Sequence, residues 1–178
     1  MKTSKIIIVF CISFVLIIAL FMLPFAYFSY AVKWKYIVDD FGVYKNDFEN
    51  LVFFSEEYYN AKVHQDNPNL EECVLGVDYD IINKHHILFD DERIEMKNDV
   101  RNSLDRIAND AFCKNLDSDL YVIVIRKNRI AFEIDNGQYA LVYSFDDSKP
   151  TYIESPDDGE KISVRKIEKY WYHVVLNH

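Results

Sequence analysis

The chain has 178 residues, half of them hydrophobic, and its 29 acidic residues outnumber 20 lysines and arginines to give a formal net charge of −9. This excess of acid disfavours nucleic acid and anionic lipid headgroups as partners, because both are repelled by a negative surface. The four glycines are too scattered for a phosphate-binding loop, and the sequence has no GxSxG, HExxH or CxxC motif. We therefore predict a protein that is not an enzyme, with no catalytic, cofactor-binding or metal-binding residues.

The first element is an uncharged stretch, residues 6–32, which follows a short basic tail, residues 1–5. A helix needs about 20 apolar residues to cross about 30 Å of hydrocarbon, so this stretch predicts a single transmembrane anchor in contact with the lipid bilayer. The aromatic and basic residues typical of a membrane–water interface come at its end and just beyond: Tyr27, Tyr30, Lys33, Trp34, Lys35 and Tyr36.

A cleavable secretory signal is the alternative interpretation of the same stretch, since Lys2 and Lys5 precede it and Ser29-Tyr30-Ala31 offers small residues. The apolar region of a signal is usually about 7–15 residues, which is shorter than this one, so we favour an uncleaved anchor. Lysines flank both ends, so charge alone leaves the orientation open. The short basic tail favours a cell-membrane protein with its domain on the extracytoplasmic side.

Beyond the anchor, residues 33–46 predict a juxtamembrane connection and residues 47–178 a single domain. Without the first 32 residues, 18 basic residues face 29 acids, a formal net charge of −11. Cys73 and Cys113 allow two interpretations. In an oxidising compartment they would pair and stabilise the fold by roughly 4 kcal/mol; otherwise they are two buried thiols.

Two helices are predicted from apolar residues that recur at spacings of three and four. In the first, Asp47 is the expected N-cap, the end falls near Lys62, and the apolar face is Phe48, Leu51, Val52, Ser55, Tyr58 and Tyr59. Phe53 and Phe54 widen this face, which indicates a helix covered by a core rather than a ligand groove. The second helix is capped by Asn98 or Asp99, ends by Lys114, and has the face Val100, Leu104, Ile107, Ala108, Ala111 and Phe112.

Strands are predicted in two groups. Cys73–Tyr79 and His86–Phe89 are short strands between the helices, followed by a polar turn at Asp90-Asp91-Glu92. After the second helix the period becomes two, and the predicted strands are Leu120–Ile125, Arg129–Ile134, Tyr139–Phe145, Lys161–Ile167 and Tyr170–Leu176, with a brief extension at Thr151–Glu154. Lys127-Asn128 and Asp135-Asn136-Gly137 are the expected hairpin turns. The fold class is therefore α+β: an N-terminal transmembrane helix, then a two-layer domain of about two helices packed on an antiparallel β-meander of about five strands.

Three short motifs near the carboxyl end carry a resemblance: Leu141-Val142-Tyr143-Ser144, Lys149-Pro150 and Trp171-Tyr172-His173. Over about 40 residues this pattern resembles small membrane-anchored proteins of uncharacterised function in Gram-positive bacteria. The resemblance implies a similar helix-plus-meander domain and a cell-envelope setting, and it implies no active-site residues.

The candidate chemical groups favour structural roles. His85 and His86 are adjacent, so on a strand they point to opposite faces and cannot share a metal ion. The acidic loops lack the spacing of a calcium-binding loop and are expected to be solvated turns: Asp78-x-Asp80, Asp90-Asp91-Glu92, Asp117-x-Asp119 and Asp157-Asp158-x-Glu160. A Cys113–His173 pair resembles a thiol hydrolase only by chance. The aromatic groups Tyr58-Tyr59 and Tyr170-Trp171-Tyr172 suit a core or a binding face.

These observations leave three hypotheses of function. The favoured one is a non-enzymatic module of the cell envelope that binds a protein, a peptide or cell-wall material. The second is an immunity-type or accessory protein whose acidic surface meets a cationic toxin or a membrane complex. The third is a hydrolase with an unrecognised site.

Overall fold

The computed structural model describes residues 40–63, 71–79, 84–111, 120–134, 138–151 and 161–176, together with Ile18, Met22, Leu23 and Val38. The chain divides into two units, Met1–Tyr36 and Ile37–His178. Apart from Ile18, Met22 and Leu23, the anchor predicted over residues 6–32 lies outside the described residues. No helix within the described ranges is long and apolar enough to span a bilayer, so the anchor stays a prediction.

The first helix of the domain, α2 (Phe41–Tyr58), begins before Asp47, so the predicted N-cap is wrong. Asp40, whose φ of 54° is left-handed, precedes the first turn. Phe41 is buried, with its ring centroid 6.1 Å from that of Phe48 and 5.1 Å from that of Trp171. Burial of Phe41 holds the first turn in the domain, so residues 41–46 of the predicted connection are helical.

Both helices end in one π-helical turn. Helix α2 continues as η1 (Tyr59–Val63), which confirms the predicted end near Lys62. Helix α4 (Asn98–Arg106) continues as η2 (Ile107–Ala111). Its N-cap residue is Lys97, so the predicted cap at Asn98 or Asp99 is wrong by one or two positions. The buried residues of α4 and η2 confirm the predicted face over most of its length: Val100, Leu104, Ile107 and Ala111.

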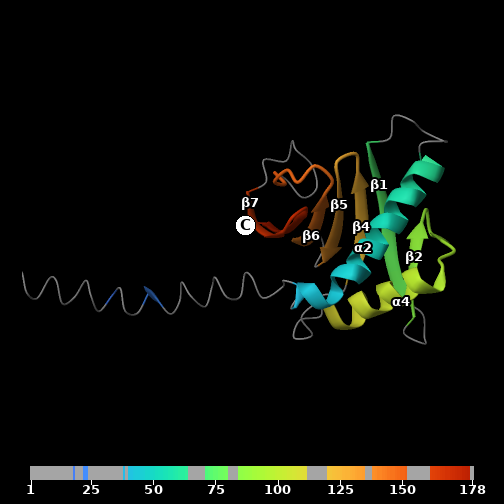
Figure 1. The fold of residues 1–178 in the computed structure, drawn as a ribbon, viewed down its shortest axis with the longest axis horizontal. Helices are drawn as coiled ribbons and strands as arrows, with labels where there is room; N and C mark the ends of the chain where they lie inside the picture. The colour runs from blue at the N-terminus through green and yellow to red at the C-terminus, as the bar shows by residue number, and fades with distance from the viewer. Residues whose placement is uncertain are drawn as a thin grey trace, which may run out of the picture. The chain divides into compact units, whose positions relative to one another are not determined.

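Within the described ranges, eight antiparallel strands form one sheet: β1 (Glu72–Tyr79), β2 (His85–Phe89), β3 (Glu92–Arg93), β4 (Leu120–Arg126), β5 (Arg129–Ile134), β6 (Tyr139–Ser144), β7 (Ile162–Glu168) and β8 (Trp171–Leu176). Their order is β3-β2-β1-β4-β5-β6-β8-β7. Figure 1 shows α2 and α4 lying on one face of this sheet. The α+β class is thereby confirmed.

The predicted five-strand meander is wrong in two respects. Strands β1 to β3, which lie between the helices in sequence, extend the same sheet by pairing β1 with β4, for example Cys73 opposite Ile125. In addition, β8 lies between β6 and β7, so β7 does not follow β6 in space. Both features depend on pairing between distant segments, which local periodicity does not encode.

The hairpin turns agree with the local signals. Lys127-Asn128 joins β4 to β5, and β5 pairs with β6 across the predicted turn at Asp135-Asn136-Gly137, which itself lies outside the described residues. At the polar turn between β2 and β3, Asp90 and Asp91 both have positive φ, 50° and 63°. This is the backbone of a type I′ hairpin turn, which aspartate tolerates better than most residues.

The core on the helix side is built from large aromatic and aliphatic side chains. Phe48 of α2 meets Phe132 of β5 edge to face, with ring centroids 5.2 Å apart, and Trp171 of β8 packs on both. Leu141 lies directly opposite Phe132 in the neighbouring strand. Phe132 and Leu141 are buried, so the predicted core face of these strands is confirmed.

The opposite face is also buried at the centre of the sheet, which the predicted two-layer domain, with helices on one face alone, does not account for. Every residue of β5 is buried, including Ala131 and Glu133, which alternate with Phe132. The buried apolar residues of this second face form a cluster of their own: Val124, Ala131, Ala140, Val142, Tyr172 and Val174. The centre of the sheet is therefore enclosed on both sides.

Candidate functional site

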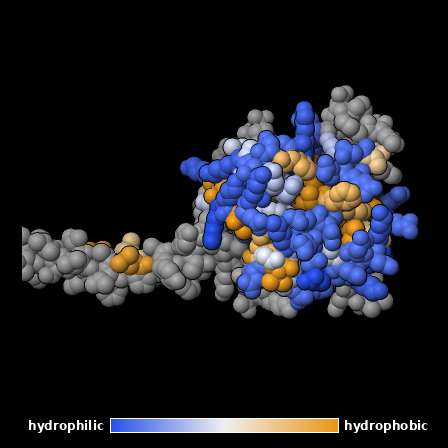
Figure 2. Space-filling model, in the orientation of Figure 1, coloured by the Kyte–Doolittle hydropathy of each residue, from blue (hydrophilic) through white to orange (hydrophobic). Residues whose placement is uncertain are grey.

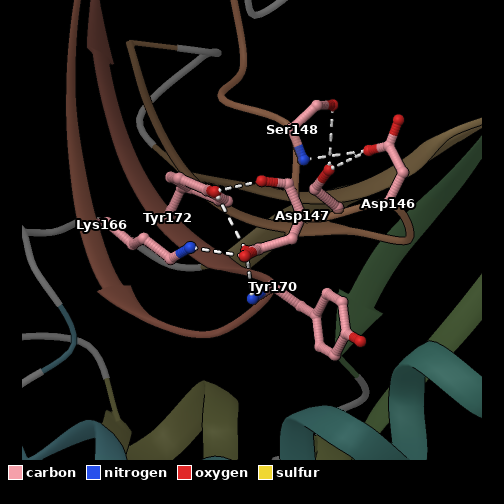
Figure 3. A network of polar contacts seen from close by, with 7 residues as sticks. Asp146, Asp147, Ser148, Lys166, Tyr170 and Tyr172 are labelled. Carbon is pink, nitrogen blue, oxygen red and sulfur yellow. Dashed lines mark hydrogen bonds and ion pairs between the residues drawn. The ribbon is translucent and has the colours of Figure 1, made fainter.

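The polar network around Asp147 joins the end of β6 to the turn between β7 and β8 (Figure 3). The hydroxyl of Tyr172 donates to the Asp147 carbonyl at 2.6 Å, and the Tyr170 N–H donates to Asp147 Oδ1 at 2.7 Å. Lys166 Nζ lies 2.6 Å from Asp147 Oδ2. The hydrogen bond from Lys166, followed by that from the Tyr170 N–H, lowers the pKa of Asp147.

This network holds two residues in the left-handed region, Asp147 at φ 59° and Tyr170 at φ 71°. Such conformations are uncommon outside glycine and persist where other contacts fix them. Beside them, Asp146 Oδ1 accepts from the Ser144 hydroxyl at 2.9 Å and the Ser148 N–H at 3.0 Å. Bonds from Ser148 and Ser144 lower the pKa of Asp146 to about 2. Both carboxylates are thus used to hold the backbone, which is a structural role.

A second network joins the two helices. The Ser103 hydroxyl of α4 donates to Asp47 Oδ1 at 3.0 Å and accepts from Asn50 Nδ2 at 3.0 Å. Arg106 Nη1 lies 3.1 Å from Asp47 Oδ2 and its guanidinium lies 5.9 Å from the centre of the Tyr44 ring. Asp47 therefore serves the contact between the helices, which explains its place inside α2.

The histidine pair is split as the sequence predicted. His85 and His86 are consecutive in β2, where His85 lies opposite Tyr79 and His86 opposite Asp78. The Asp105 carboxylate of α4 accepts the backbone N–H of His85 at 2.8 Å and lies 3.1 Å from its Nδ1. No short-range pattern in the sequence indicates this pairing, because Asp105 belongs to the polar face of another element, 20 residues from His85.

Of Cys113 and His173, which resemble a thiol hydrolase pair only by chance, the structure describes His173. His173 is buried on the helix side of the sheet, opposite Leu141, and burial together with nearby Arg165 lowers its pKa to about 3. Cys113 lies outside the described residues. Cys73 is a free, buried thiol whose pKa burial raises to about 11, so its reactive thiolate form is disfavoured at neutral pH.

The aromatic groups divide between core and surface. Trp171 and Tyr172 are buried, which confirms the core interpretation for both. Tyr58 is half-buried between Phe54 of α2 and Phe89 of β2, with ring centroids 6.3 and 5.7 Å away. These rings fill the space between the end of α2 and the sheet.

Phe53 behaves differently, and here the prediction that it widens the covered apolar face of α2 is wrong. Its side chain is 68% exposed. Positions three and four residues away on a helix are its neighbours, and at these positions stand the exposed acids Glu49, Glu56 and Glu57. We call these four residues the Phe53 surface. A large exposed ring within an acidic rim is the best candidate functional site among the described residues.

Charge is divided unevenly along the described chain. Residues 40–63, 71–79 and 84–111 contain 15 acids and seven lysines and arginines, whereas residues 120–134, 138–151 and 161–176 contain four acids and eight. Figure 2 shows a largely hydrophilic face over the helices, with smaller hydrophobic patches between the polar side chains. The Phe53 surface belongs to the acidic part.

Groups of three or more histidine, cysteine or acidic side chains arranged to hold a metal ion are not found in the described ranges. Comparisons of the chain with protein families, with curated proteins and with solved structures find no match.

Proposed function

We propose that this chain is a membrane-anchored, non-enzymatic binding module, and that its Phe53 surface contacts a cationic segment of a partner protein. The exposure of Phe53 carries the proposal. Leaving a phenylalanine in water forgoes roughly 1.5–3 kcal/mol of burial, and a partner that covers it recovers this free energy.

The acidic rim defines the chemistry of the partner. Aromatic anchors surrounded by polar residues are typical of the energetically important centres of protein interfaces. Glu49, Glu56 and Glu57 would favour lysine or arginine around the pocket that receives Phe53, and would repel acidic surfaces. The charge of this part of the domain also supports the second hypothesis, an accessory protein that meets a cationic toxin or a membrane complex, since the same surface would serve both.

The test compares Phe53→Ser with Val43→Ser in the full chain. Both residues are apolar, exposed and on α2, at 68% and 60% exposure. We expect both variants to fold with unchanged stability, and only Phe53→Ser to lose the partner that co-purifies with a tagged chain from membranes. If the partner still co-purifies with both variants, the proposal is overturned.

Salt then separates the two contributions. Glu56→Gln with Glu57→Gln is expected to weaken the complex at low salt and to matter little at high salt, because exposed charges are screened beyond about a Debye length. If the complex survives Phe53→Ser but dissociates at high salt, the partner is bound by the charge of the acidic surface alone.

A further inference from the structure

Strand β7 (Ile162–Glu168), labelled in Figure 1, forms one edge of the sheet. In the strand order it lies next to β8 and farthest from β3. An edge strand has backbone groups on one side without a partner in the sheet, and an extended peptide can pair with them. Strand β3 at the other edge has only two residues, so β7 is the longer edge.

The hydrogen-bonding direction of β8 follows from two bonds to its other neighbour. The Leu176 N–H donates to the Gln138 carbonyl at 2.9 Å, and the Ser144 N–H donates to the Tyr170 carbonyl at 2.8 Å. Alternate residues of an antiparallel strand point their backbone groups to alternate sides. The even-numbered residues of β8 therefore bond to β6, and the odd-numbered ones bond to β7.

The register between β7 and β8 then identifies the open groups. Ser163 and Arg165 lie opposite odd-numbered residues of β8, so their backbone groups point inward. The N–H and C=O groups of Ile162, Val164 and Lys166 point outward, and no described strand pairs with them. The side chains of Ile162 and Val164 pack against the apolar cluster on the face opposite the helices.

The charge of this edge selects its partner. Residues 161–169 carry four cations, Lys161, Arg165, Lys166 and Lys169, and one anion, Glu168. Lys166 is paired with Asp147 and Glu168 with Lys45, so the edge keeps an excess of positive charge. A second copy would bring two basic strands together, and a register shift between Lys166 and Glu168 limits a straight pairing further. Anionic lipid would satisfy the charges but not the open backbone groups, so a polypeptide strand fits the edge better.

We propose that β7 is a docking strand for an extended acidic segment of a partner protein, which would add a ninth strand to the sheet. The residues of the partner segment would alternate between apolar and acidic. Its apolar side chains would extend the apolar cluster beside Ile162 and Val164, and its acidic side chains would lie on the other face, near Lys161 and Lys169 at the two ends of β7. This inference is independent of the Phe53 surface, which favours a cationic partner.

The probe is an octapeptide of alternating valine and acidic residues, labelled for fluorescence anisotropy and added to the purified full chain. A matched peptide with lysine in place of each acid is expected to bind at least about tenfold more weakly at low salt. Methylating the backbone nitrogens on the side that faces β7 is expected to abolish binding, and methylating the other side to preserve it. Equal binding of the acidic and basic peptides would overturn the proposal.

Hydrogen exchange reads the register directly. The amides of Ile162, Val164 and Lys166 are expected to exchange quickly in the free chain and slowly with the acidic peptide, whereas Ser163 and Arg165 exchange slowly in both. Slow exchange of the first three without peptide would overturn the proposal. If that protection disappears on dilution, the edge pairs with a second copy; if it persists, another part of the chain covers the edge.

Two variants separate backbone pairing from charge. Val164→Pro removes an outward N–H and leaves the ladder to β8 intact, so it is expected to abolish peptide binding in a folded chain. Lys161→Glu with Lys169→Glu is expected to weaken binding about tenfold. Its matched control, Arg93→Glu with Lys127→Glu, changes two exposed cations, one in β3 at the opposite edge of the sheet and one in the turn between β4 and β5. A different pattern would overturn the proposal in favour of a general anion site. In that pattern the peptide still binds Val164→Pro, and the variant with Lys161→Glu and Lys169→Glu loses binding both to the peptide and to phosphatidylserine vesicles.

Discussion

The hydroxyl of Ser103 donates a hydrogen bond to the carboxylate of Asp47 across the contact between α4 and α2, with 3.0 Å between the oxygens. Both residues are buried, so the carboxylate depends on this donor more than on the exposed Arg106. A buried carboxylate that is left without a hydrogen-bond donor costs free energy, because it has lost its contacts with water and gained nothing in return. Loss of the Ser103 hydroxyl should therefore destabilise the contact between α2 and α4.

We expect Ser103→Ala to lower the free energy of unfolding by about 1–3 kcal/mol. Its control, Arg106→Gln, removes the half-exposed end of the same network and is expected to cost less than about 1 kcal/mol. Urea unfolding followed by circular dichroism measures both. A larger loss for Arg106→Gln than for Ser103→Ala would show that the ion pair, rather than the buried hydroxyl, stabilises the helix contact.

His173 predicts a specific dependence of stability on pH. Its pKa is about 3 in the folded chain against 6.5 for a free histidine, so the unfolded chain binds one more proton between these values. Stability from this group is therefore complete above about pH 6.5 and falls by about 1.4 kcal/mol per pH unit as the pH drops towards 3.

His173→Leu tests this, because leucine cannot titrate. We expect the stability of the variant relative to the native chain to rise by roughly 2 kcal/mol between pH 7 and pH 5, measured by urea unfolding at each pH. Parallel curves for the two proteins over this range would mean that His173 is accessible to protons in the folded state.

Both faces are buried at the centre of the sheet, which predicts that substitutions there are costly on the face opposite the helices as well. Val142 belongs to the second cluster and is 2% exposed, whereas Val74 is 46% exposed. We expect Val142→Ala to cost more than about 1 kcal/mol and Val74→Ala less than about 0.5 kcal/mol. Phe132→Ala on the helix side is expected to cost about 3–5 kcal/mol. Similar, small losses for both valines would mean that the second face is open to water.

The predicted anchor is tested in membranes. We expect the full chain to remain in the membrane pellet after an alkaline carbonate wash, and Leu16→Arg to oppose insertion by about 2.5–3.5 kcal/mol. Recovery of a secreted protein that begins near Val32 would instead identify residues 6–32 as a cleaved signal.

Local signals predicted those parts of the fold that local chemistry determines. The apolar period placed α4, and the alternation from Leu120 onward placed β4 to β6 with the turn at Lys127-Asn128 between two of them. The N-cap prediction for Asp47 was wrong because an aspartate directly before an apolar face usually caps a helix. Here the carboxylate instead accepts a hydrogen bond from Ser103, 56 residues away. No local pattern records such a distant partner.

The candidate sites were the harder part for the same reason. Phe53 sits beside buried residues in sequence, and its exposure depends on where the second helix and the sheet leave α2 uncovered. The open edge at β7 depends on β8 lying next to β6. Both sites are properties of the tertiary arrangement rather than of any short motif.

The position of β8 between β6 and β7 has a consequence for the order of folding. Strand β7 is made before β8 but has no place in the sheet until β8 has paired with β6. A nascent chain that has exposed β7 alone would hold an unpaired, β-branched segment with Ile162 and Val164 in water, which is a target for chaperones and for misassembly. Strand β7 therefore joins the sheet only after β8 has paired with β6. The same pairing of β8 brings Trp171, the largest fully buried side chain among the described residues, into the core.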